Sequence, residues 1–106
     1  MTTAAPLKVG VIGLGFGHKV HIPAFQSDPR FKIFGVCSER AEKAQAVAEE
    51  LQLSFHTSRW QELVSHPEID VIALAVPPLL QPTILKTAIQ NKKHIFAEKP
   101  IGGDPT

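Results

Sequence analysis

The sequence has little of what marks exported or membrane-bound proteins. It contains one cysteine, Cys37, so an internal disulfide is excluded. Residues 1–6 have neither the basic start nor the apolar stretch of a signal peptide. No apolar run approaches the roughly 20 residues that a membrane-spanning helix needs. We therefore expect a soluble cytoplasmic protein with no membrane partner, in which Cys37 is a small buried residue at the end of an apolar run.

The chain also lacks an excess of charge of either sign. Its 11 basic and 10 acidic residues leave a net charge of +1. The longest basic run is Lys92-Lys93, which we expect at a solvated helix end. A nucleic-acid partner is not expected. Nor is a metal, because His18 and His21 stand three residues apart without a further ligand at suitable spacing nearby.

What the chain does have is a regular alternation of short apolar runs and helical patterns, within one domain of 106 residues. Runs typical of strands lie at 7–12, 31–37, 53–56, 71–76 and 94–97. Helices are expected over about 18–27, 39–51, 59–64 and 80–90. Such alternation predicts a doubly wound parallel α/β sheet of the Rossmann type with strand order 3-2-1-4-5.

Turn and cap residues refine these boundaries. Pro23 fits only the first turn of its helix or a kink, because it cannot donate a backbone hydrogen bond. Ser38 and Ser58 are expected as N-caps of the helices that follow them. Asn91 is a plausible helix end, and Trp60 is expected to pack its short helix against the sheet. His56, His66 and His94 are each expected to be structural or solvent-facing.

The turn after the first strand reads Gly13-Leu14-Gly15-Phe16-Gly17. Glycines at such a turn let the backbone approach a phosphate closely, and the helix that follows points free N–H groups at the anion. The dinucleotide fingerprint is G-x-G-x-x-G/A, but His18 stands in its third place and Gly17 comes one place early. A glycine-rich turn without a ligand is the alternative reading.

Other unusual residues fall on the same edge of the predicted sheet. Ser38 follows the second strand, Pro77 the fourth and Glu98 the fifth. The carboxyl ends of parallel strands meet at one edge, where α/β proteins bind ligands. The combination favours a binding site more than any one feature does.

Four stretches resemble a known family: Gly13-Leu14-Gly15-Phe16-Gly17 with His21-Ile22-Pro23-Ala24-Phe25, Asp70-Val71-Ile72-Ala73-Leu74-Ala75-Val76-Pro77-Pro78, Lys93-His94-Ile95-Phe96-Ala97, and Glu98-Lys99-Pro100. Over its whole length the chain looks like the N-terminal nucleotide-binding half of the Gfo/Idh/MocA oxidoreductases, which include glucose–fructose oxidoreductase and inositol dehydrogenase.

The resemblance implies a nicotinamide cofactor across this edge and a sugar, polyol or related small molecule as substrate. It implies that Lys99 is catalytic, where its ammonium would polarise a carbonyl or stabilise an alkoxide. It also implies that the peptide before Pro100 is often cis. The cofactor-binding residues that it implies, together with those read from the second strand's end, are Gly13, Leu14, Gly15, Phe16, Gly17, Ser38, Arg40, Val76, Pro77, Gln81, Glu98 and Lys99.

The chain departs from the family at three points. His18 replaces the third glycine, and Gln81 stands where the family often has a histidine; an amide cannot carry a proton in catalysis. The family's second domain, which holds substrate and further catalytic residues, has no counterpart here. We therefore expect residues 1–106 to be part of a longer enzyme that forms a homo-oligomer, and to be inactive alone.

The end of the second strand bears on which cofactor is bound. NAD-binding proteins usually carry an acidic residue there for the ribose hydroxyls. Ser38 occupies that place and leaves room for a 2′-phosphate, which Arg40 and Lys43 could pair with. This favours NADP over NAD. Alternatively, Glu39 takes the acidic role and NAD is bound, or Ser38 and Arg40 have only helix roles.

Three functions remain open from the sequence. The first is the cofactor domain of an NAD(P)-dependent oxidoreductase acting on CH–OH or carbonyl groups, which Lys99 favours. The second is a non-catalytic NAD(P) sensor or regulatory protein on the same fold, which Gln81 weakly favours. The third, a methyltransferase-like domain, normally needs an acidic residue after the second strand and gives Glu98-Lys99-Pro100 no role.

Overall fold

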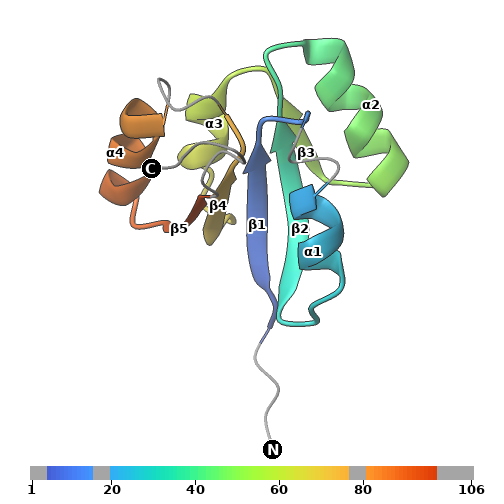
Figure 1. The fold of residues 1–106 in the computed structure, drawn as a ribbon, viewed down its shortest axis with the longest axis horizontal. Helices are drawn as coiled ribbons and strands as arrows, with labels where there is room; N and C mark the ends of the chain where they lie inside the picture. Colours follow the sequence, from blue (N-terminus) through green and yellow to red (C-terminus); the bar gives the residue numbers. More distant parts are fainter. Residues whose placement is uncertain (1–4, 16–19, 77–80, 98–106) are drawn as a thin grey trace, which may run out of the picture.

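The computed structural model describes residues 5–15, 20–76 and 81–97. Within these ranges no helix is long and apolar enough to cross a membrane. Strands and helices alternate along the chain (Figure 1), in the order β1 (Leu7–Ile12), α1 (Ile22–Gln26), β2 (Phe31–Cys37), α2 (Ala41–Leu51), β3 (Phe55–Thr57), α3 (Trp60–Val64), β4 (Val71–Leu74), α4 (Gln81–Gln90) and β5 (His94–Ala97).

The five strands form one parallel sheet in the order β3-β2-β1-β4-β5, which confirms the predicted topology. Helices α1 and α2 pack on one face of the sheet, and α3 and α4 on the other (Figure 1). The order reverses at β1, whose neighbours are β2 and β4. A ligand crevice is therefore expected above the carboxyl ends of these three strands.

Apart from Lys8 near the start of β1, the central strands β1 and β4 are apolar because both of their faces are covered. Val9 and Val11 of β1 join the core beneath α1 and α2, whereas Ile12 joins the core beneath α3 and α4. In β4, Ala73 lies in the core beneath α1 and α2, and Leu74 lies in the core beneath α3 and α4. This alternation explains why both runs read as continuous hydrophobic segments rather than as alternating polar and apolar residues.

Two glycines let α3 lie close to the sheet. A Cβ on Gly10 would come within 2.9 Å of the side chains of Ile69 and Leu63, and one on Gly35 within 3.1 Å of Phe55. Leu63 is fully buried against the sheet. The short α3 is thus anchored by close contact with the backbones of β1 and β2.

Several boundaries differ from those predicted. Helix α1 spans Ile22–Gln26 with Pro23 in its first turn, and Val20 and His21 ahead of it are also helical; residues 16–19 lie outside the described ranges. Strand β4 ends at Leu74, although the Ala75 amide still donates to Ile12 at 2.9 Å. Strand β3 occupies 55–57 rather than 53–56. Strands β2 and β5 have the predicted bounds.

The predicted caps at Ser38 and Ser58 are wrong. Helices α2 and α3 begin after Arg40 and Arg59, and neither start has a side-chain cap hydrogen bond. The Ser38 hydroxyl instead accepts a hydrogen bond from the Arg40 amide at 3.2 Å, which forms a tight turn before α2. Ahead of α3, the Thr57 hydroxyl accepts from the Arg59 amide at 3.0 Å.

The two longest helices end in the same way, on non-glycine residues. Gln52 and Lys92 have φ values of 57° and 60°, in the left-handed region. After Gln52, the amide of Leu53 donates to the Ala48 oxygen at 2.8 Å. After Lys92, the amide of Lys93 donates to the Ala88 oxygen at 3.0 Å. This is the Schellman arrangement. Helix α4 thus ends directly before Asn91, as expected, and the left-handed residue is Lys92.

Lys93 is also not the solvated residue that we expected. It is half-buried, and its Nζ donates to the backbone oxygens of His66 and Ile69 at 2.6 and 2.5 Å. Burial lowers the pKa of Lys93, while the charge of Asp70 acts against that shift. The lysine therefore ties the start of β5 to the segment between α3 and β4.

Candidate functional site

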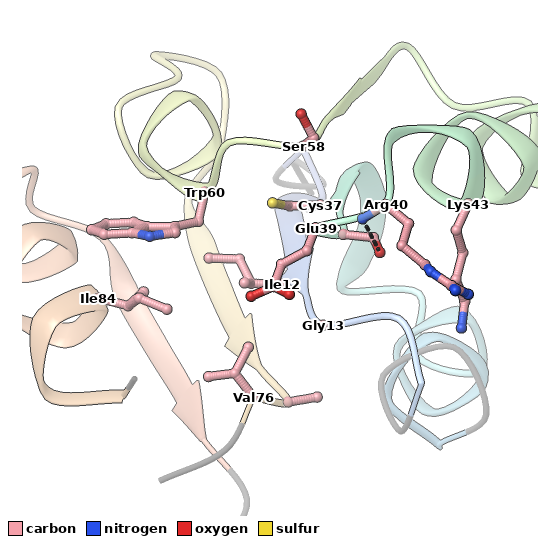
Figure 2. A pocket seen from close by; sticks show the side chains of 12 residues that line it. Ile12, Gly13, Cys37, Glu39, Arg40, Lys43, Ser58, Trp60, Val76 and Ile84 are labelled. Carbon is pink, nitrogen blue, oxygen red and sulfur yellow. Dashed lines mark hydrogen bonds between the residues drawn. The ribbon is translucent and has the colours of Figure 1, made fainter. Parts of the chain in front are cut away.

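A cavity of about 360 Å³ opens at the carboxyl edge of the sheet (Figure 2). It is bordered by the ends of β1, β2 and β4, by the residues that open α2 and α3, and by one residue of α4. This is the crevice expected where the strand order reverses. Of the predicted cofactor-binding residues, Gly13, Ser38, Arg40 and Val76 line it.

The two glycines of the β1 turn that the structure describes differ in their surroundings. Gly13 has φ +96°, and its amide donates to Cys37 at 3.0 Å. A Cβ on Gly13 would lie 2.4 Å from the Ala75 backbone oxygen, so only glycine fits there. A Cβ on Gly15 would meet nothing within 4 Å. Gly13 is needed for the fold, and the open space at Gly15 suits close approach of a ligand.

Leu14, between these glycines, is buried in the core beneath α1 and α2. Its side chain does not line the cavity. Phe16, Gly17, Pro77, Glu98 and Lys99, together with the Pro100 peptide, lie outside the described residues.

Polar and charged residues from the start of α2 form one wall of the cavity. Ser38, Glu39, Arg40 and Lys43 all line it. The Arg40 and Lys43 side chains extend in the same direction, away from Trp60, whereas the Glu39 carboxylate points toward Ile12 in the middle of the cavity (Figure 2). Two cations against one anion make this wall net positive, which suits a phosphate.

The opposite wall is apolar and was missed in the sequence. Trp60 and Ile84 line it, together with Val76, although Trp60 was expected only to pack against the sheet. Trp60 does pack on the core beneath α3 and α4, but it stays partly exposed toward the cavity. Its position at the start of the helix that follows β3, near the binding edge, was the signal available in the sequence.

Gln81 does not line the cavity itself, but it contacts the lining residue Val76. Its side-chain amide donates to the Val76 backbone oxygen at 3.1 Å, across the connection between β4 and α4. The contact holds Val76, a lining residue, against the start of α4. Gln81 therefore acts in the described structure as a positioning residue for the cavity wall.

Cys37 lies at the floor of the cavity and is buried, as predicted. Burial raises the pKa of its thiol from the usual 9.0 to about 12, and the negative charges of Glu62 and Glu39 add to the shift. A thiol with so high a pKa is a poor nucleophile at neutral pH. The chemistry of the site therefore does not run through Cys37.

Two of the described histidines, His21 and His66, are packed against aromatic rings, whereas His56 and His94 are exposed. His21 is buried with its ring edge-to-face against Phe96, 5.2 Å between centroids. His66 packs against Phe34 and Phe55 and accepts a hydrogen bond from the Glu68 amide at 3.1 Å. Among the residues that the structure describes, no group of three or more His, Cys, Asp or Glu is placed to hold a metal ion.

The chain matches, over residues 7–105, the family model described as "Oxidoreductase family, NAD-binding Rossmann fold". An uncharacterized oxidoreductase of Synechocystis sp. is 38% identical over 101 residues, which are 95% of this chain and 27% of that protein. Across the first three curated relatives, the chain spans 23–27% of their length.

Two solved structures that contain a bound nicotinamide cofactor are similar to this fold. Levoglucosan dehydrogenase in complex with NADH and L-sorbose has a TM-score of 0.81 at 30% identity, over 92% of this chain and 28% of that one. Biliverdin reductase from Synechocystis sp. PCC 6803, in complex with biliverdin and NADP+, has a TM-score of 0.78 at 28% identity, over 91% and 30%.

Proposed function

We propose that this chain, which belongs to the Gfo/Idh/MocA family of oxidoreductases, binds NADP in the cavity at the carboxyl edge of its sheet. The family match supports a nicotinamide cofactor, and the two walls of the cavity suit different parts of one. Gly15 leaves open space beside the β1 turn, as close approach of a pyrophosphate requires. The charged wall suits a sugar phosphate and the apolar wall a flat base.

The observation that carries the choice of NADP is the pair of cations at the start of α2. Arg40 and Lys43 line the cavity beside Ser38, which stands where NAD-binding proteins usually place a carboxylate. A guanidinium holds a phosphate through charge-assisted hydrogen bonds worth about 1.5–3 kcal/mol. Arg40 and Lys43 are thus the proposed partners of the 2′-phosphate.

Replacing either cation by alanine tests this choice. We expect Arg40→Ala and Lys43→Ala to weaken NADPH binding by roughly ten- to a hundredfold and NADH binding by less than about threefold, since only NADPH carries the 2′-phosphate. Calorimetric titration of both cofactors measures the difference. Lys32→Ala, an exposed cation at the start of β2 on the opposite edge, is the matched control and should change neither affinity.

Glu39 supports the competing choice of NAD, because its carboxylate points into the cavity and could accept hydrogen bonds from ribose hydroxyls (Figure 2). Its charge would also oppose a 2′-phosphate. Under our proposal, Glu39→Gln strengthens NADPH binding by several fold. A large loss of NADH affinity in Glu39→Gln, with NADPH binding weak in both proteins, would favour NAD.

For the whole protein, we propose oxidation or reduction of a CH–OH or carbonyl group on a sugar, polyol or related small molecule. The proposal rests on family membership and on Lys99 as the catalytic lysine, which lies outside the described residues. Substrate binding and self-association would depend on the rest of a longer chain. The small share of its relatives' length that this chain spans supports this. Lys99→Ala in the full-length protein should abolish turnover while cofactor binding persists.

The engagement of Gln81 with Val76 favours a second candidate, a non-catalytic NAD(P) sensor. A side-chain amide at this place orients the cavity wall but transfers no proton. Cofactor binding by the full-length protein without turnover of any sugar or polyol tested would support the sensor and contradict the enzyme.

A further inference from the structure

We propose that Trp60 forms the aromatic wall of an adenine subsite and is a specificity-determining residue for the adenosine half of the cofactor. The inference rests on the proposed function and deepens it. It concerns the apolar end of the cavity, where Trp60, Ile84 and Val76 meet. Its ligand chemistry is a flat purine base joined through a ribose to a phosphate.

The first argument is the division of the cavity into two ends. Figure 2 shows Arg40 and Lys43 on one side and Trp60 and Ile84 on the opposite side, with Glu39 and Ile12 between them. An adenosine phosphate has the same sequence of properties: an anionic group, a polar ribose and an apolar ring. A ligand whose phosphate meets the cations therefore extends its base toward Trp60.

The second argument is that the indole is held in place before any ligand arrives. Trp60 is the first residue of α3. The turn ahead of it is fixed by Thr57, whose hydroxyl accepts from the Arg59 amide at 3.0 Å and donates to the Glu62 carboxylate at 2.5 Å. Part of the Trp60 ring packs against the buried core while the rest is accessible. A preorganised ring loses little entropy when a base packs against it.

The third argument is energetic. Contact between a base and an aromatic side chain is commonly worth about 1–3 kcal/mol, which is roughly five- to a hundred-and-fiftyfold in affinity. Trp60 is also the only tryptophan of a chain without tyrosine, so its emission alone reports on this wall. A bound purine in contact with the indole must therefore change the intrinsic fluorescence of the protein.

The probe is adenosine 2′,5′-bisphosphate, which carries the base and both phosphates but no nicotinamide. We expect it to compete with NADPH and to change the Trp60 emission on binding. Trp60→Leu, which keeps apolar bulk but removes the aromatic ring, should weaken binding of the bisphosphate and of NADPH by at least about tenfold. Trp60→Phe should recover affinity to within about threefold of the original protein. Thermal unfolding of each variant separates loss of the subsite from loss of the fold.

The outcomes distinguish this inference from the function on which it rests. If the unaltered chain binds NADPH, but the bisphosphate leaves the Trp60 emission unchanged and Trp60→Leu binds as tightly, the inference is wrong and the proposed function stands. If neither NADPH nor NADH binds, the proposed function fails and the inference fails with it. If Trp60→Leu does not fold, the emission decides: a change on binding of the bisphosphate supports the inference, and an unchanged emission overturns it.

Discussion

At the scale of single residues, Gly13 and Gly15 illustrate how the same residue type serves two purposes in one turn. Gly13 is required by the backbone, because its φ is +96° and a Cβ would lie 2.4 Å from the Ala75 oxygen. Gly15 is not, since a Cβ there meets nothing within 4 Å. The sequence motif treats them alike, and only the packing separates a folding role from a binding role.

We therefore predict opposite effects for two matched substitutions. Gly13→Ala should lower the free energy of unfolding by at least about 1–3 kcal/mol, through backbone strain and overlap with Ala75. Gly15→Ala should change it by less than about 0.5 kcal/mol yet weaken NADPH binding at least tenfold, because the methyl group occupies the approach to the backbone. Urea unfolding and calorimetry measure the two effects.

A Gly15→Ala protein that binds NADPH as tightly as the original would contradict the role given to the β1 turn. A stable Gly13→Ala protein would contradict the close packing of this turn against the end of β4. The pair thus tests the fold and the site independently.

Cys37 provides a test that depends on pH. Its thiol has a pKa raised to about 12 by burial, above the usual 9.0. A group with a raised pKa in the folded state stabilises the fold fully below its unfolded pKa, and this contribution is lost as the pH rises toward the folded pKa. The free energy of unfolding should therefore fall between pH 9 and 12, and Cys37→Ala should remove that part of the fall.

Thiol labelling checks the same property more simply. At pH 8 the native protein should react with a disulfide reagent at least a hundredfold more slowly than the protein in urea, because the reactive species is the thiolate. Rapid labelling of the native protein would show that Cys37 is accessible and ionised, contrary to the structure.

At the scale of elements, the ends of α2 and α4 are the least favourable local conformations described. Gln52 and Lys92 adopt left-handed φ values that L-residues with a side chain avoid at a cost of about 1–2 kcal/mol. Glycine would remove that cost but lose more entropy on folding. We predict that Gln52→Gly and Lys92→Gly each raise the free energy of unfolding by about 0.5–1 kcal/mol.

The matched control is Ala46→Gly, at an exposed position in the middle of α2. It should lower the free energy of unfolding by about 1 kcal/mol, since glycine is a poor residue inside a helix. Chemical denaturation of the three variants compares them. Destabilisation by Gln52→Gly of the size seen in the control would argue against the Schellman ending.

The strands were predictable from the sequence, while the helix starts were not. The mainly apolar runs of β1, β2 and β4, interrupted only by Lys8 and Lys32 near the strand starts, follow from burial on both faces of the sheet. The caps depend on competition between nearby hydroxyls: Ser38 bonds the Arg40 amide inside a turn, and Thr57 takes the place expected of Ser58. Which hydroxyl accepts the hydrogen bond ahead of a helix depends on the local backbone geometry, and the residue types alone do not determine that geometry.

At the scale of the whole molecule, the sheet order places the predicted site. The ends of β1, β2 and β4 meet at one edge only because β4 returns to the far side of β1. The alternation of strands and helices, with right-handed connections, predicted this arrangement correctly. Gly13, Ser38, Arg40 and Val76 come together as expected, from three separate strand ends.

The apolar half of the cavity was missed, although the position of Trp60 after β3 was a signal in the sequence, because Trp60 was assigned to the core alone. Trp60 and Ile84 reach the site from α3 and α4, on the far side of the sheet from the glycine turn's helix. Their apolar character predicts packing in the core, which both residues also do. The lining of the cavity shows that Trp60 contacts both the core and the open space of the site.

The measurement that tests the central claim most directly is a side-by-side equilibrium titration of residues 1–106 with NADPH and with NADH. The account predicts saturable binding of both at the carboxyl edge, with NADPH bound at least about tenfold more tightly because Arg40 and Lys43 meet the 2′-phosphate. Equal affinities, or tighter binding of NADH, would contradict the assignment of the charged wall to a phosphate and make Glu39 the residue that selects the cofactor.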